Sequence, residues 1–226
     1  ELGTREEGCT IHMVGLFIDP ESPALQELMD WQMESRQERN REMIQKLIDL
    51  GFQISFEDFQ QFQGSLLTRA HIADLLAQRG YGETQKEVGA KYLDPGCIGY
   101  VERKVLPVER CISAIHRAGG LAIVAHPNQI DRKDRDRGLA ICQRILAMGA
   151  DGIEARYCEF DDDWRARAEA FAQENGCLRS GGSDFHGRFK KGLDLGVGYG
   201  DLQVPLSFLE AMEETLARRD AQALDA

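Results

Sequence analysis

The 226-residue sequence lacks the features that would place the protein in a membrane or send it out of the cell. No apolar run approaches the roughly 18 residues that suggest a membrane-spanning helix. The first nine residues contain no apolar core, so they do not form a signal peptide. We find no internal repeat and no low-complexity tract. We therefore expect a cytoplasmic globular protein with no membrane partner.

Positive charge and closely paired cysteines are also scarce. The formal net charge is −11, which argues against broad electrostatic binding to nucleic acid and leaves room only for a local basic cluster. We therefore expect no extended duplex partner. None of the six cysteines forms a C-x-x-C pair, so we expect reduced thiols rather than disulfides or a thiolate metal site. The composition does not indicate an oligomeric state.

The second half of the sequence alternates between helix and strand. A buried apolar strand is predicted at residues 121–125, and further short strands at residues 151–155 and 177–180. Helices are predicted around them at residues 108–118, 138–148, 163–174 and 205–218. Such alternation is typical of parallel βα units in an open sheet or a barrel. The sequence therefore predicts the α/β fold class.

Residues 20–106 have a different pattern. A strand at residues 10–17 precedes them, and a long helix follows from Pro23 to Leu50. Shorter helical segments are predicted at residues 55–62, 68–79 and 83–93. We interpret residues 20–106 as a mainly helical insertion, a substrate cap, within a domain formed by residues 1–19 and 107–226. The mixed-charge run at residues 131–137 is interpreted as a solvated loop.

Side chains that can bind metals follow two of the predicted strands. His126 comes directly after residues 121–125, and Asp184 and His186 come shortly after residues 177–180. The carboxyl ends of parallel strands share one face, so these three side chains should converge. Imidazole and carboxylate together suit Zn, Mn or Fe, although a single histidine at a strand end can also be a hydrogen-bonded structural residue. The combination favours a metal site.

Three pieces of the sequence resemble one family. They are IHMVG at residues 11–15, AHP at 125–127 and GSDFH at 182–186. In this order they resemble the PHP (polymerase and histidinol phosphatase) superfamily, in particular its bacterial nucleoside 3′,5′-bisphosphate phosphatases and 5′-to-3′ exonucleases. The resemblance covers nearly the whole chain, including the helical insertion. It implies a distorted (β/α)7-type barrel with a metal site at its carboxyl-terminal rim.

The resemblance also implies ligands and a reaction. Glu1, His12, His126, Asp184 and His186 would bind two or three divalent metal ions (Mn, Zn or Fe), and the last three residues would also be catalytic. Glu1 would match a glutamate that bridges metals in the family, although as the first residue it could equally be a frayed terminus. The implied reaction hydrolyses phosphate monoesters or diesters of nucleotides, such as nucleoside 3′,5′-bisphosphates or short 5′-phosphorylated oligonucleotides, by metal-activated water.

The sequence departs from the family pattern at its beginning. The H-x-H-x-x-x-S-D-G and T-D-H-D elements that supply further ligands in the family are absent. Without the insertion about 140 residues remain, enough for four or five βα units of roughly 30 residues each. A closed barrel needs about 250 residues. We therefore expect the barrel to lack its first strands.

Basic residues in the insertion form a second candidate site. Arg36 and Arg39 lie three residues apart on the long helix and share one face, and Arg69 and His71 open a later helix. The pattern alone fits a solvated helix face with paired charges, because glutamates are interleaved. The resemblance implies instead that these four residues bind the substrate phosphate that is not cleaved, and guanidinium groups suit phosphate oxygens.

Two other functions stay open. The missing H-x-H element motivates a non-catalytic remnant that binds only a nucleotide or a partner. An amidohydrolase-type metallohydrolase would also place His and Asp at the strand ends of a barrel. The arginines of the insertion and the GSDFH piece favour phosphoester substrates over amides.

Overall fold

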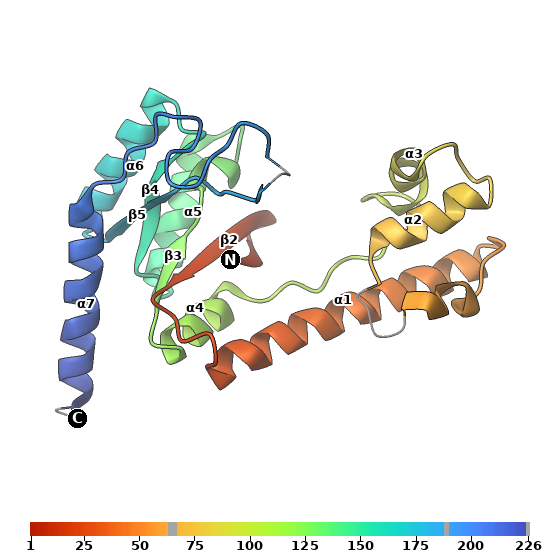
Figure 1. Ribbon diagram of the computed structural model, residues 1–226, viewed down its shortest axis with the longest axis horizontal. Coiled ribbons are helices and arrows are strands. Elements are labelled where there is room, and N and C mark those ends of the chain that lie inside the picture. The colour runs from red at the N-terminus through yellow and green to blue at the C-terminus, as the bar shows by residue number, and fades with distance from the viewer. Residues whose placement is uncertain (63–66, 188–189, 225–226) are drawn as a thin grey trace. The chain divides into compact units, whose positions relative to one another are not determined.

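The computed structural model describes residues 1–62, 67–187 and 190–224. The chain divides into two compact units (Figure 1). One unit combines Glu1–Gln26 with Val105–Ala226, and the other comprises Glu27–Lys104. The sheet belongs to the first unit, and most of the helical segments between residues 23 and 93 belong to the second; the interpretation of residues 20–106 as a substrate cap stays a prediction.

A five-stranded mixed sheet forms the centre of the α/β unit within the described residues. The strands are β1 (Leu2–Glu6), β2 (Cys9–Leu16), β3 (Leu121–Val124), β4 (Gly152–Tyr157) and β5 (Leu178–Gly182), and they lie in this order. β1, β2 and β3 are antiparallel neighbours, whereas β3, β4 and β5 are parallel. The predicted α/β class and parallel βα units are confirmed, and the distorted (β/α)7-type barrel without its first strands stays a prediction.

A tight hairpin connects β1 to β2. Its two linking residues, Glu7 and Gly8, both have positive φ angles, of 45° and 79°. This backbone twist suits a two-residue turn between antiparallel strands. The hairpin brings the start of the chain alongside His12, because Gly3 pairs with His12 in the register.

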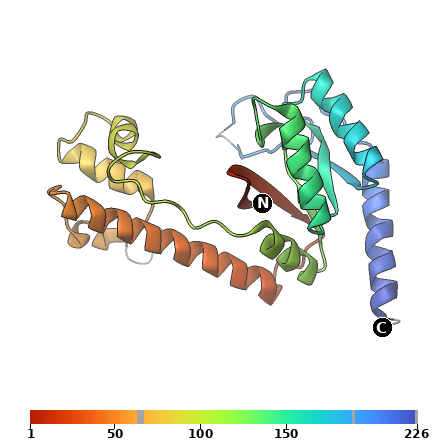
Figure 2. The ribbon, with the colours of Figure 1, turned by 180° about the vertical axis from the view of Figure 1, so that it is seen from behind.

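Four helices of the α/β unit pack on the sheet. They are α4 (Val108–Arg117), α5 (Arg135–Ala147), α6 (Asp162–Glu174) and α7 (Leu206–Leu224). Leu121 and Ile123 of β3 pack against Met212 of α7, with the side chains of Val14, Leu16, Leu178 and Leu216 around them. The alternate residues of β3, Ala122 and Val124, are also fully buried, so the sheet is covered on both faces. α5 lies in front of the sheet in Figure 2.

The start of α5 corrects one prediction. The run at residues 131–137 was expected to be a solvated loop, but the helix begins at Arg135, inside this run. Asp134 caps it by accepting a hydrogen bond from the backbone N–H of Arg137. The Arg135 guanidinium, 2.6 Å from a carboxylate oxygen of Asp161, further stabilises this first turn. Capping and ion pairing therefore start the helix within the charged run, although that run has no helical pattern of apolar residues.

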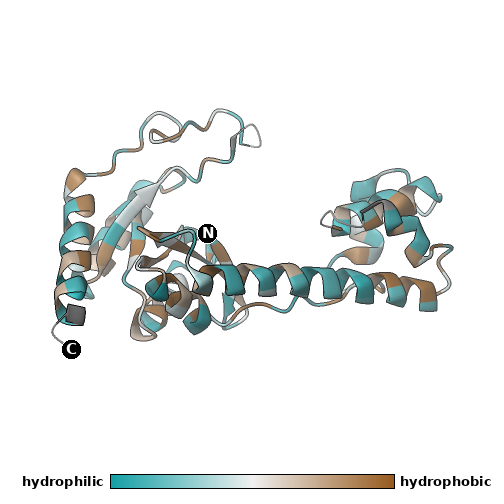
Figure 3. Ribbon diagram, turned by 60° about the horizontal axis from the view of Figure 1, so that its bottom comes forward, coloured by the Kyte–Doolittle hydropathy of each residue, from teal (hydrophilic) through white to brown (hydrophobic). Residues whose placement is uncertain are grey.

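The helical unit has a core of its own. It is built from α1 (Pro23–Asp49), a 3-10 helix (Phe56–Phe62), α2 (Arg69–Gln78), α3 (Gln85–Val88) and a π-helical turn (Gly89–Leu93). Met43, Ile44 and Leu47 at the end of α1 pack against Ile72 and Leu76 of α2. Figure 3 shows hydrophilic residues along much of α1.

No helix in the described part of the chain is long and apolar enough to cross a membrane.

A buried aspartate connects four elements of the α/β unit. Asp151, just before β4, is only 5% exposed and accepts hydrogen bonds from the backbone N–H of Ala122 (2.7 Å) and from His116 Nε2 (2.8 Å). It also forms an ion pair with Arg219 of α7. Burial alone would raise the pKa of Asp151, but these hydrogen bonds outweigh burial and hold the pKa below its ordinary value of 3.8.

We predict that Asp151→Asn lowers the free energy of unfolding by about 3 kcal/mol at neutral pH. Because the folded-state pKa is depressed, this stabilisation is complete above the unfolded value of 3.8 and is lost as the pH falls through the folded value. Denaturant titrations at pH 7 and near pH 3 should therefore show the difference between variant and wild type shrinking in acid. Asp201→Asn, at a side chain that is 71% exposed, is the control and should change stability little. An equal loss at both pH values would contradict this account.

Candidate metal centre

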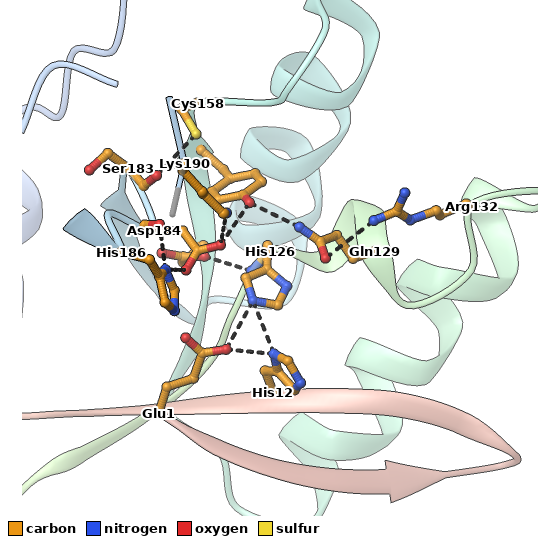
Figure 4. A network of polar contacts seen from close by, with 12 residues as sticks. Glu1, His12, His126, Gln129, Arg132, Cys158, Ser183, Asp184, His186 and Lys190 are labelled. Atoms are coloured by element: carbon orange, nitrogen blue, oxygen red, sulfur yellow. Dashed lines mark hydrogen bonds and ion pairs between the residues drawn. The ribbon is translucent and has the colours of Figure 1, made fainter. Parts of the chain in front are cut away.

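A carboxylate and two imidazoles converge at the edge of the sheet (Figure 4). Glu1 Oε1 lies 2.5 Å from His12 Nδ1 and 3.1 Å from His126 Nε2, and the two imidazole nitrogens lie 3.3 Å apart. Among the described residues these three form the one group of at least three acidic, His or Cys side chains whose ligand atoms could share a metal ion. The carboxylate of Glu1 therefore contacts both imidazoles.

The strand register explains this convergence. Gly3 pairs with His12, so Glu1 and His12 point to the same face of the β1–β2 hairpin. Met13 pairs with Val124, and the backbone N–H of Ala125 donates to the carbonyl of His12 at 2.9 Å. His126 follows directly and sets its ring edge-on to that of His12, with 5.0 Å between ring centroids. Three residues far apart in sequence are thus brought together by antiparallel pairing.

The predicted ligands Asp184 and His186 lie on the opposite wall of the same cleft (Figure 4). Asp184 Oδ1 is 3.0 Å from His186 Nδ1, and its Oδ2 is 2.5 Å from Lys190 Nζ. The cleft has a volume of about 540 Å³ and is lined by Glu1, His12, His126, Gln129, Arg132, Glu159, Asp184, His186 and Lys190. All five predicted ligands therefore share one cleft, but the structure places only three of them within mutual ligand distance.

Two of the predicted ligands have strained backbones. His126 has a φ of +28° and Asp184 a φ of +51°, in the left-handed region that residues with a Cβ atom rarely adopt. Such conformations cost about 1–3 kcal/mol each and cluster at functional sites. Each residue lies two positions beyond the end of a strand, where the backbone must turn to direct the side chain into the cleft. The strain is consistent with a functional role for this rim.

The cleft concentrates negative charge that is only partly neutralised. Hydrogen bonds from His12 and His126 hold the pKa of Glu1 far below its ordinary value. Burial alone would lower the pKa of His126, but its hydrogen bond to Glu1 and the nearby Glu154 carboxylate raise it. Burial raises the pKa of Glu154 to about 7. The site thus stabilises positive charge at its centre, which is the environment that a cation requires.

The residues at this centre fit a divalent transition metal. Two imidazoles and one carboxylate form a donor set suited to Zn, Mn or Fe. Ligand atoms that each lie about 2.1 Å from a tetrahedral metal are about 3.4 Å from one another. The separations of 2.5–3.3 Å among Glu1, His12 and His126 are close to this value. Small displacements of the Glu1 carboxylate would admit an ion.

Sequence reasoning missed the residues that support these side chains. Tyr157 at the end of β4 is 1% exposed; its hydroxyl donates to Asp184 Oδ2 (3.2 Å) and accepts from Gln129 Nε2 (2.9 Å). Glu154 in the middle of β4 accepts a hydrogen bond from the backbone N–H of His126. The one available signal was a charged residue inside the apolar strand DGIEA. The partners could not be identified without the strand register.

The helical unit contains a separate small pocket rich in arginine. Its volume is about 140 Å³, and its lining comprises Arg36, Arg39, Asn40, Leu67, Thr68, Arg69 and Arg103. Burial lowers the pKa of Arg103, and the nearby Arg36 and Arg39 lower it further. Four guanidinium groups around one pocket repel each other, so an anion bound there would relieve the repulsion.

The four predicted phosphate-binding residues differ in their surroundings. Arg36, Arg39 and Arg69 line the pocket; Arg39 Nε donates to the carbonyl of Val101 at 2.8 Å, and Arg69 forms an ion pair with Asp94. His71 is not among the lining residues. Its Nδ1 instead accepts the backbone N–H of Thr68 in a capping box at the start of α2. Arg103 is an additional lining residue that the motif did not indicate.

Comparisons with known proteins establish the family. No protein-family model matches the chain. A 5′-3′ exoribonuclease of Haemophilus influenzae is 32% identical over 186 residues, which cover 82% of this chain and 68% of that protein. A 3′,5′-nucleoside bisphosphate phosphatase of Chromobacterium violaceum is 33% identical over 193 residues, which cover 83% of this chain and 66% of that protein.

Other relatives agree. The 5′-3′ exoribonuclease Rnm of Salmonella typhimurium is 32% identical over 82% of this chain and 64% of its own length. The chain therefore spans slightly less than two thirds of the length of the Salmonella and Chromobacterium relatives. The match to the Haemophilus protein is sufficient to show that the chain belongs to the PHP family. The resemblance inferred from the sequence is confirmed.

Solved structures support the same fold. An amidohydrolase from Chromobacterium violaceum, solved with bound sulfate and no metal, superposes with a TM-score of 0.61 and 31% identity, over 86% of this chain and 68% of that chain. A structure from Bifidobacterium adolescentis, described as that of a metal-dependent phosphoesterase, superposes with a TM-score of 0.63 over 93% of this chain and 73% of that chain. Its identity is 24%, so this second likeness bears on the fold alone.

We predict that the protein binds Mn²⁺ and that His12→Gln weakens binding by at least about 100-fold, since changes outside the ligand set already cost 10- to 100-fold. Calorimetric titration with Mn²⁺ measures the affinity. His71→Gln is the matched control, because glutamine also satisfies a capping box and His71 belongs to the helical unit. Equal affinities of His12→Gln and wild type would exclude His12 as a ligand.

Proposed function

We propose that the protein is a metal-dependent phosphoesterase that hydrolyses phosphate monoesters or diesters of nucleotides, with nucleoside 3′,5′-bisphosphates or short 5′-phosphorylated oligonucleotides as substrates. The observation that carries this proposal is the convergence of Glu1, His12 and His126 in a cleft that also contains Asp184 and His186. The nucleotide substrates named for the exoribonuclease and bisphosphate phosphatase relatives support the substrate class.

Glu1, His12 and His126 would hold one divalent cation, and Asp184 and His186 would serve as ligands on the opposite wall. Such cations polarise a phosphoryl oxygen and bring the pKa of bound water towards neutrality. The Tyr157 hydroxyl donates to the carboxylate of Asp184, and Gln129 in turn donates to that hydroxyl. The restraint fixes its orientation before any ligand binds.

Cationic side chains of the cleft would receive the substrate phosphate. Lys190 Nζ lies against Asp184, and Arg132 lines the same cleft. A phosphoryl group that enters the cleft brings negative charge, which these two side chains can stabilise by charge-assisted hydrogen bonds. They offset the carboxylates that would otherwise repel the substrate.

The arginine pocket of the helical unit would bind a phosphate that is not cleaved. Arg36, Arg39, Arg69 and Arg103 provide guanidinium donors around a volume of about 140 Å³, which suits one small anion. The local cluster explains how a protein of net charge −11 can bind a polyanionic substrate. His71 would contribute by fixing the start of α2 and thereby the neighbouring Arg69.

Release of inorganic phosphate from a nucleoside 3′,5′-bisphosphate in the presence of Mn²⁺ tests the reaction. We expect release that stops on addition of a chelator and resumes when Mn²⁺ is restored. A protein that binds Mn²⁺ but releases neither phosphate from the bisphosphate nor mononucleotides from a 5′-phosphorylated oligonucleotide would favour the non-catalytic alternative. Turnover of an amide or cyclic amide in its place would favour an amidohydrolase.

A second prediction concerns the arginine pocket. Arg36→Gln should raise the KM for a bisphosphate by about 10-fold with little change in kcat, because one charged hydrogen bond contributes about 1.5 kcal/mol to binding. Arg41→Gln, on the same helix but outside the pocket, is the control and should leave the KM unchanged. A KM for Arg36→Gln equal to that of the control would remove Arg36 from the substrate site.

A further inference from the structure

The buried carboxylate of Glu154 is unusual in the core of the α/β unit. Glu154 lies in the middle of β4 and is 8% exposed. Its neighbours in the strand, Ile153 and Ala155, are fully buried apolar residues. Burial of a carboxylate is costly, and a well-packed apolar side chain of similar volume would often stabilise the fold at least as well. The carboxylate therefore requires an explanation other than packing.

Its principal partner is the backbone of His126. The N–H of His126 donates to Glu154 Oε2 at 2.6 Å, which is short for an N–H···O hydrogen bond. The last residues that pair between β3 and β4 are Val124 and Ile153, and Val124 lies two residues before His126. The side chain of Glu154 therefore provides a hydrogen-bond acceptor for the N–H of His126, which lies beyond the strand pairing and has no partner strand to accept it.

This hydrogen bond acts on a strained residue. With a φ of +28°, His126 is held in a conformation that an unrestrained histidine rarely adopts. Such conformations persist only where the surrounding structure fixes them. The same conformation directs His126 Nε2 to within 3.3 Å of His12 Nδ1. Restraint of the backbone and position of the imidazole are thus linked.

The other oxygen of Glu154 is enclosed by β5. A Cβ atom built on Gly182 would lie only 3.0 Å from Glu154 Oε1, so a larger residue there would crowd the carboxylate. Gly182 is the last residue of β5 and begins the GSDFH piece. Its lack of a side chain allows the carboxylate to occupy this position between β4 and β5.

We propose that Glu154 is a positioning residue that fixes the imidazole of His126 for metal binding, by accepting the backbone N–H of His126. This inference rests on the proposed metal centre. Glu154 acts through His126 and not as a ligand, since the ligand group at this centre consists of Glu1, His12 and His126. Partners of this kind typically contribute 10- to 100-fold to metal affinity.

Two variants separate the hydrogen bond from packing. Glu154→Gln keeps an acceptor oxygen and the shape of the side chain, whereas Glu154→Met keeps similar volume and removes the acceptor. We expect the Mn²⁺ affinity to fall in the order wild type, Gln, Met, with Met at least about tenfold weaker than Gln. Ser180→Ala, at the buried residue that pairs with Glu154 on β5, controls for the disturbance of the sheet. Its affinity should equal that of wild type.

A second measurement does not depend on metal. In protein labelled with ¹⁵N-histidine, five backbone amides are observed, and that of His126 is identified by its loss in His126→Asn. We expect its proton resonance to lie far downfield and to be protected from exchange in wild type and Glu154→Gln. In Glu154→Met both signatures should disappear. If Glu154→Met does not fold, retention of the signal in Glu154→Gln supports the hydrogen bond and its loss contradicts it.

The possible failures are distinguishable. Wild-type protein that binds no Mn²⁺ would overturn the metal centre and this inference with it. Tight binding by wild type that is unchanged in Glu154→Met would overturn the role of Glu154 alone. Equal weakening in Gln and Met would show that Glu154 acts by its charge and not by its hydrogen bond, which also contradicts the proposal.

Discussion

The site depends on the antiparallel pairing of β1, β2 and β3. This pairing places Glu1 and His12 on one face of a hairpin and sets His126 beside them, so that three ligand atoms approach within 3.3 Å. Register is essential, because a shift by one residue would turn His12 to the opposite face. The parallel strands then bring Asp184 and His186 to the same cleft. Mixed pairing therefore builds a site that parallel βα units alone would leave without Glu1 and His12.

The two units carry local charge of opposite sign at their candidate sites. The α/β unit gathers carboxylates around imidazoles, and this charge suits a cation. The helical unit gathers four arginines around a small pocket, and this charge suits a phosphate. The net charge of −11 describes neither site, because both depend on local arrangement. Two sites of opposite local charge can therefore coexist in one acidic protein, as the proposed metal centre and phosphate pocket require.

Much of this could be predicted from the sequence, and the remainder could not for identifiable reasons. His126, Asp184 and His186 come shortly after predicted strands, and strand ends of parallel units share one face. The roles of Glu154 and Tyr157 could not be predicted, because they depend on their hydrogen-bond partners on other segments. These partners are the backbone N–H of His126 and the carboxylate of Asp184. The start of α5 at Arg135 was missed because a capping Asp134 and ion pairs replaced the apolar pattern. His71 appeared in a basic motif, but its ring caps a helix, which is a local geometry that the motif does not specify.

The most direct test of the account is crystallographic. Crystals grown with Mn²⁺ and measured on both sides of the manganese absorption edge would locate the ion by its anomalous signal. The account predicts a peak within bonding distance of Glu1, His12 and His126. A peak elsewhere, or no peak in crystals of a protein that keeps this fold, would contradict the claim that the hairpin and β3 build a metal centre.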